Sequence, residues 1–170
     1  MTYRVGISGL RRGASLARVF RLMEDCSVVA GCDPEAGARA AFSREFPSAA
    51  VVSGYDELLA AGLDMAVVAS PVPMHAAQTV AALEAGCHVL QEVYLADTLD
   101  GCRAIYEAVQ QRPRQCFMLA ENCCYWGHVM AWEKLFQEGQ LGELVYAEAE
   151  YVHDCRELTL DAAATGSIHP

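Results

Sequence analysis

The feature that most constrains the fold is a regular alternation of short apolar runs with longer segments of helical periodicity. The apolar runs predict strands at residues 5–8, 27–32, 49–52, 65–69, 87–90 and 115–120. The segments between them predict helices at 14–23, 34–46, 55–60, 73–85 and 98–110. Because parallel strands require crossover connections of one hand, this order predicts an α/β fold with a doubly wound parallel sheet.

The pattern changes after Ala120. Residues 125–138 predict an amphipathic helix, and residues 144–153 alternate apolar and polar side chains like a half-buried antiparallel strand. One helix and one strand cannot build a core of their own. We therefore predict one domain at 1–120 and, at 121–170, the beginning of an incomplete second α/β domain with an antiparallel sheet, for substrate binding or dimerisation. An exposed strand at 144–153 would pair with a second copy or a partner chain.

Composition limits the partners and the compartment. The net charge of −10 disfavours nucleic acid, whose phosphates an acidic surface repels. No apolar run approaches a membrane span and no leader pattern opens the chain, so we expect a cytoplasmic protein without membrane contact. The eight cysteines form no C-x-x-C pair. We expect no metal site, and cysteines that serve as small buried hydrophobes in a reducing compartment.

A glycine turn follows the first predicted strand. Aligned on the dinucleotide fingerprint G-x-G-x-x-G/A, the chain has Gly9, Arg11 and Ala14, with an additional Gly13. Glycine there permits a sharp turn and close approach of the backbone to a pyrophosphate, which the helix N-terminus attracts. Arg11 has two opposed interpretations: its Cβ crowds the pyrophosphate, whereas its guanidinium can bind phosphate.

An acid ends the second predicted strand. At that position Asp33 would accept hydrogen bonds from ribose hydroxyls and repel a 2′-phosphate, which favours NAD(H) over NADP(H). Asp33 could also cap a helix that begins at Pro34, and both roles can hold together.

Two further motifs carry a family resemblance. Ser70-Pro71-Val72-Pro73-Met74-His75 and Gly86-Cys87-His88-Val89-Leu90-Gln91-Glu92 resemble the T-P-x-x-x-H and G-K-H-V-L-x-E-K-P segments of the glucose–fructose oxidoreductase / inositol dehydrogenase / MocA (Gfo/Idh/MocA) family. The resemblance extends from about Tyr3 to His153. It implies a Rossmann domain and NAD(P)-dependent oxidation or reduction of sugars, polyols and similar carbohydrate substrates. By position, the residues that match its cofactor-lining motifs are Gly9, Asp33, Ser70, Pro71, His75 and Glu92.

The chain departs from this family at a catalytic position. Val93 stands where the family has the lysine of E-K-P, which lies beside the nicotinamide. The only lysine, Lys134, falls on a predicted helix as a solvated charge. Relatives that read E-V-x include glycoside hydrolases with tightly retained NAD. Whether the chain is an enzyme therefore stays open among three interpretations: an oxidoreductase, a hydrolase-type relative and a non-catalytic nucleotide-binding or partner module.

No catalytic residue is assigned, but three side chains are candidates. His75 could donate a hydrogen bond near a nicotinamide or be satisfied locally at a helix start. Tyr151 and His153 share one face of the predicted strand, so they could line a substrate pocket or be exposed.

Overall fold

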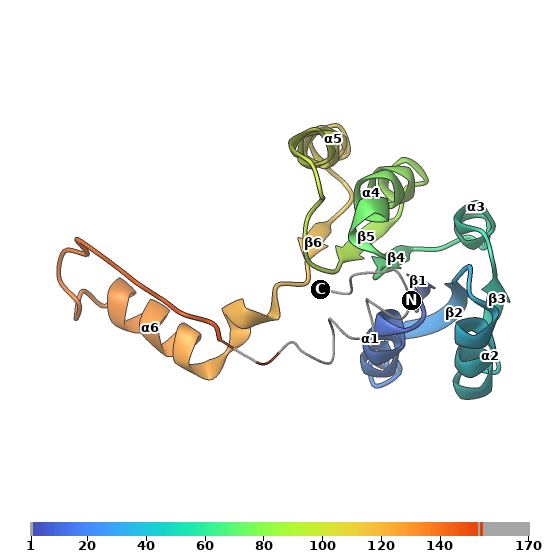
Figure 1. The fold of residues 1–170 in the computed structure, drawn as a ribbon, viewed down its shortest axis with the longest axis horizontal. Helices are drawn as coiled ribbons and strands as arrows, with labels where there is room; N and C mark the ends of the chain where they lie inside the picture. The colour runs from blue at the N-terminus through green and yellow to red at the C-terminus, as the bar shows by residue number, and fades with distance from the viewer. Residues whose placement is uncertain (1, 153, 155–170) are drawn as a thin grey trace. The chain divides into compact units, whose positions relative to one another are not determined.

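A six-stranded parallel sheet forms the centre of the fold (Figure 1). The structure, a computed structural model, describes residues 2–152 and 154. The sheet order is β3-β2-β1-β4-β5-β6, and every paired strand is parallel. Its strands are β1 (Tyr3–Ser8), β2 (Cys26–Cys32), β3 (Ala50–Val52), β4 (Met65–Val68), β5 (His88–Gln91) and β6 (Phe117–Leu119). The predicted doubly wound fold is confirmed, because β2 and β3 lie on one side of β1 whereas β4, β5 and β6 lie on its other side.

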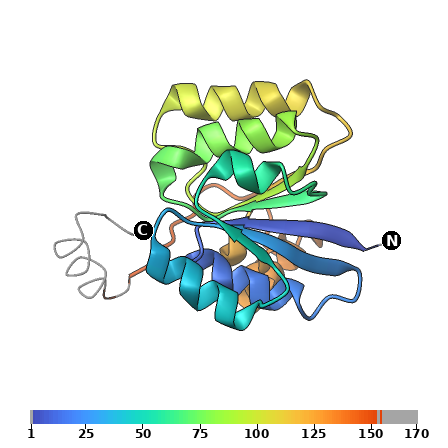
Figure 2. The same ribbon diagram turned by 90° about the vertical axis from the view of Figure 1, so that its right-hand side faces the viewer.

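Helices cover both faces of the sheet (Figures 1 and 2). One face carries α1 (Arg12–Phe20) and α2 (Ala36–Glu45). The opposite face carries α3 (Tyr55–Leu59), α4 (His75–Glu84) and α5 (Leu99–Gln110), with the short 3-10 helix η1 (Val72–Met74) leading directly into α4. Apolar side chains fill both interfaces: Ile7 and Phe42 pack in the α1–α2 layer, and Val68 and Leu83 pack in the layer of α4 and α5.

Two helix starts show how local sequence sets the boundaries. Thr98 caps α5 as its sequence position indicates, since its Oγ1 accepts a hydrogen bond from Gly101 N at 3.1 Å. The prediction that a helix begins at Pro34 is wrong. That helix begins at Ala36 and its cap is Glu35, so Asp33 does not cap it.

The chain divides into two compact units, 1–121 and 122–170. In the second unit the structure describes η2 (Asn122–Tyr125) and α6 (Gly127–Gln137), where the predicted helix is found and Lys134 is exposed. The predicted strand at 144–153 is wrong for residues 144–152, which form no strand, and His153 lies outside the described residues. A strand needs a neighbour for its backbone groups, and no described segment pairs with this one. Its pairing with another chain stays a prediction, which sedimentation velocity tests.

The cysteines are less buried than their apolar surroundings indicate. Among the seven in the described part of the chain, only Cys32 and Cys87 are buried, whereas Cys116 and Cys124 are exposed. Cys116 lies just before β6, and Cys124 lies within η2. In residues 2–152 and 154 we find no cluster of three potential metal ligands. No helix in that part of the chain is long and apolar enough to cross a membrane.

Candidate dinucleotide site

Gly9 lies where the strand order reverses. Its φ of +83° is left-handed, and a Cβ on Gly9 would lie 2.3 Å from the Ala69 carbonyl oxygen at the end of β4. Gly9 N also donates to Cys32 O at 2.9 Å, so the turn contacts the ends of both neighbouring strands. Only glycine meets the dihedral and steric demands together. The turn therefore lies at the switch point between the ends of β2 and β4, the edge at which doubly wound sheets bind ligands.

The glycine that lets helix and strand pack closely is Gly13 rather than Ala14. Gly13 is buried at the start of α1, and a Cβ there would lie 2.5 Å from Ile7 Cγ2. Ala14 is half-buried beside it. Gly13, one position before Ala14, thus permits the close packing expected of the fingerprint's third residue, while Ala14 packs against the same core. Arg11 is the N-cap of α1, and its side chain forms no capping hydrogen bond. The first turn of this helix, which follows Gly9 directly, is where an anion would find free N–H groups.

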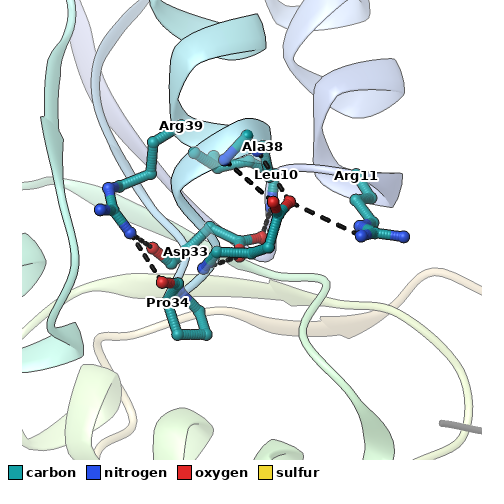
Figure 3. A network of polar contacts seen from close by, with 8 residues as sticks. Leu10, Arg11, Asp33, Pro34, Ala38 and Arg39 are labelled. Carbon is teal, nitrogen blue, oxygen red and sulfur yellow. Dashed lines mark hydrogen bonds and ion pairs between the residues drawn. The ribbon is translucent and has the colours of Figure 1, made fainter. Parts of the chain in front are cut away.

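Asp33 joins the turns that follow β1 and β2 (Figure 3). Its Oδ2 accepts from Leu10 N at 2.8 Å, and its Oδ1 accepts from Glu35 N at 2.9 Å. The residue is only 8% exposed. Each carboxylate oxygen can accept a second hydrogen bond, so Asp33 retains acceptor capacity for a ribose hydroxyl.

Glu35 places a second carboxylate beside Asp33. Its oxygens accept from Ala38 N and Gly37 N at 2.8 and 2.9 Å. These backbone donors, Ala38 first, and the nearby Arg11 guanidinium lower the pKa of the Glu35 carboxyl. Arg11 Nη2 lies 3.6 Å from Glu35 Oε2, and its side chain is 61% exposed (Figure 3).

Arg39 completes this polar group from α2. Its Nη1 donates to the carbonyl oxygens of Asp33 and Pro34 at 2.7 and 2.8 Å (Figure 3). The guanidinium thus stabilises the backbone of the turn after β2. Two carboxylates and two guanidinium groups therefore surround the carboxyl end of β2.

Of the predicted motif residues, Ser70 and Pro71 lie in the turn after β4, and His75 begins α4. Ser70 Oγ donates to Gln78 Oε1 at 2.8 Å, and the same oxygen accepts from Ser8 Oγ at 2.9 Å. Pro71 precedes η1 as its N-cap. These hydrogen bonds join the ends of β1 and β4 through a glutamine of α4.

His75 is buried at the start of α4, with 1% exposure. Its Nδ1 lies 2.7 Å from Tyr94 O and its Nε2 lies 2.7 Å from Ser70 O. Both ring nitrogens thus lie within hydrogen-bond distance of a backbone oxygen, and a neutral imidazole, with its single N–H, donates to one of the two. Of the two interpretations of His75, this geometry supports the locally satisfied helix-start residue over a catalytic group.

Glu92 follows β5 and forms an ion pair with Arg12 of α1. Arg12 Nε donates to Glu92 Oε1 at 2.6 Å, and the Glu92 side chain is 9% exposed. The pair links the glycine turn to the turn after β5, where Val93 is half-buried. Glu92 thus lies at the predicted site edge, but its charge is already balanced within the protein.

The remaining candidates belong to the second unit. Tyr151 is 70% exposed, and its ring centroid lies 5.8 Å from that of Trp126. His153 lies outside the described residues. The sequence did not predict a role at this site for Arg12, Gln78 or Gln91. In the structure both glutamines are buried polar residues. The available signal was a glutamine within apolar surroundings, since such a side chain must find hydrogen-bond partners.

A parallel sheet, a glycine turn at its switch point and a buried acid at the end of β2 define a dinucleotide-binding Rossmann domain. The chain belongs to the Gfo/Idh/MocA oxidoreductase family with an NAD-binding Rossmann fold, which residues 3–120 match. The family expectation from the sequence is confirmed.

Two curated relatives are named for hydrolysis rather than redox chemistry. The chain is 32% identical to a glycosyl hydrolase family 109 protein of Solibacter usitatus, over 97% of this chain and 40% of that protein. It is 29% identical to an α-N-acetylgalactosaminidase of Shewanella oneidensis, over 90% of this chain and 36% of that protein. The chain thus spans about two fifths of the length of these relatives.

Solved structures of inositol dehydrogenases share the fold. A myo-inositol 2-dehydrogenase of Lactobacillus plantarum gives a TM-score of 0.79 at 21% identity, covering 86% of this chain and 44% of that one. A scyllo-inositol dehydrogenase of Lactobacillus casei with bound NAD(H) and scyllo-inositol also gives 0.79 at 21% identity, covering 84% and 43%. The similarity to these two proteins shows the fold alone.

Proposed function

We propose that this domain binds NAD(H) in preference to NADP(H) and serves an oxidoreductase that acts on a sugar- or polyol-like substrate. The observation that carries the cofactor preference is the pair of carboxylates, Asp33 and Glu35, at the carboxyl end of β2. The glycine turn fits a dinucleotide, because a Cβ at Gly9 would fill the space where the backbone must approach the pyrophosphate.

Charge at this edge supports NAD(H). A 2′-phosphate carries about −1.5 to −2 charges at neutral pH and would meet two carboxylates. The two arginines offset this repulsion incompletely, since Arg11 pairs with Glu35 and Arg39 donates to backbone oxygens. A ribose 2′-hydroxyl, by contrast, can donate to Asp33.

The test compares the dissociation constants of NAD⁺ and NADP⁺ for the wild type and Asp33→Asn. A hydrogen bond to a charged group contributes about 1.5–3 kcal/mol, so we expect the preference for NAD⁺ to fall about tenfold or more. The ratio of the two constants cancels any loosening of the turn that affects both ligands. Asp64→Asn is the matched control, because Asp64 Oδ2 also accepts a backbone hydrogen bond, from Arg4 N at 2.8 Å, next to the amino end of β4. An unchanged ratio in Asp33→Asn contradicts the proposal.

The redox assignment has its own test. Bound nicotinamide supplies hydride transfer, while Val93, half-buried and aliphatic, can neither hold nor transfer a substrate proton. We therefore expect a slow reaction in which NADH absorbance rises when the protein, NAD⁺ and a polyol or sugar panel are mixed. Absence of NADH formation with every substrate contradicts this assignment.

A second candidate function is a glycoside hydrolase that retains NAD. It is favoured by Val93 at the family's lysine position and by relatives named as glycosyl hydrolases. This alternative predicts nucleotide that survives desalting and release of phenol from an aryl N-acetylgalactosaminide without net NADH formation. Binding of NAD⁺ with neither reaction supports the non-catalytic nucleotide-binding module instead.

A further inference from the structure

One buried side chain hydrogen-bonds to the backbone of the turn after β5. Gln91 ends β5 with 0% exposure. Its Nε2 donates to the carbonyl oxygens of Glu92, Tyr94 and Leu95 at 3.3, 3.1 and 2.8 Å. Its Oε1 accepts from Thr79 Oγ1 of α4 at 2.6 Å. An amide nitrogen has only two hydrogens, so the three carbonyl oxygens share them.

A second buried side chain fixes the same turn from α4. His75 Nδ1 lies 2.7 Å from Tyr94 O, the oxygen that accepts from Gln91, and 3.4 Å from Gln91 Nε2 itself. His75 Nε2 lies 2.7 Å from Ser70 O, in the turn after β4. The polar network therefore joins the turns that follow β4 and β5, and it specifies one backbone shape for residues 92–95.

These two turns belong to the half of the sheet that receives the second nucleotide. In a doubly wound sheet, one mononucleotide lies over β1–β3 and the other over β4–β6, on either side of the switch point. Gly9 and Asp33 assign the adenosine and pyrophosphate half to β1 and β2. The nicotinamide half of a bound dinucleotide would therefore lie over the turns that Gln91 and His75 contact.

We propose that Gln91 is a positioning residue, which holds the turn at residues 92–95 in the shape that receives the nicotinamide half of the dinucleotide. The inference rests on the proposed dinucleotide function. It goes beyond that function because it makes the affinity for one end of the ligand depend on a fully buried residue. Gln91 acts through the backbone of the turn, with His75 as the second anchor.

The experiment measures the affinities of NAD⁺ and ADP-ribose by calorimetry. ADP-ribose contains the groups expected over β1 and β2 but lacks nicotinamide. Gln91→Met keeps the length of the side chain and removes both N–H donors. We expect NAD⁺ affinity to fall about tenfold, which is about 1.4 kcal/mol, while ADP-ribose affinity changes less than about twofold.

Two further variants complete the design. Thr79→Val keeps the shape of a side chain with 0% exposure and removes only the donor to Gln91 Oε1. It should produce the same selective loss at smaller size, and it serves where Gln91→Met does not fold. Gln115→Met is the matched control, because Gln115 Nε2 donates to a single carbonyl, Gly86 O at 3.3 Å, near the amino end of β5. Both affinities should be unchanged in that variant.

The outcomes separate the two proposals. If the wild type binds neither ligand, the proposed dinucleotide function fails. If the wild type binds both and the folded Gln91 and Thr79 variants lose both affinities equally, or lose neither, the positioning role of Gln91 is overturned while dinucleotide binding stands.

Discussion

Replacing Gly9 with alanine should destabilise the protein far more than the same change at Gly62. Both glycines have left-handed φ, +83° and +69°. An alanine in that conformation costs roughly 1–2 kcal/mol at either position. At Gly9 the new Cβ would also lie 2.3 Å from Ala69 O and 2.6 Å from Ser70 N, both backbone atoms that cannot rotate away. At Gly62 nothing lies within 4 Å of it.

The steric contact therefore accounts for the difference between the two variants. Overpacking of this kind costs about 1–3 kcal/mol, so Gly9→Ala should lose roughly 2–5 kcal/mol of unfolding free energy in total. Urea denaturation followed by circular dichroism measures both variants against the wild type. Calorimetry with NAD⁺ should show binding lost in Gly9→Ala and retained in Gly62→Ala. Equal destabilisation of the two variants would refute the argument that the β1 turn must approach β4 closely.

Three other changes test the packing, a helix cap and thiol chemistry. Leu58→Ala should lower the unfolding free energy by about 2–5 kcal/mol, because Leu58 is 0% exposed, whereas Leu22→Ala at 83% exposure should change it by less than about 0.5 kcal/mol; similar urea midpoints would contradict this. Thr98→Ala should cost about 1 kcal/mol by removing the α5 cap, and Thr98→Ser should restore most of it in the same assay. Burial, with Asp33 and Glu57 adding to it, raises the pKa of the Cys32 thiol to about 11. Less of its thiolate is then present at pH 8, so alkylation of the native protein should modify exposed Cys116 first; labelling of Cys32 at an equal rate would contradict its burial.

The sequence determined the architecture of residues 1–120 because that architecture follows from local patterns. Apolar runs of strand length separated by helical periods leave few alternatives to a doubly wound sheet. The sequence also predicted where Gly9, Asp33 and Ser70 lie, because each of them follows the end of a predicted strand. The ends of parallel strands meet at one edge, so order along the chain predicts proximity in space.

The partners of those residues were decided by tertiary structure alone. The tight packing at Gly13 is visible only in the fold, which brings Ile7 Cγ2 to 2.5 Å from the position of a Cβ there. The predicted strand at 144–153 was wrong for its described residues, because alternation indicates which face would be buried but does not supply a neighbouring strand.

The interior of the site shows the same limit most clearly. The sequence by itself gave Gln91 no role beyond its place in a family motif, and it left His75 open between a catalytic group and a structural one. Which of these they are depends on carbonyl oxygens up to 19 residues away along the chain, and on helix α4 packing against β5. A buried polar side chain must find its hydrogen-bond partners wherever the fold brings them. The sequence thus determined that a dinucleotide domain forms, and only the tertiary structure decided which side chains hold its turns in shape.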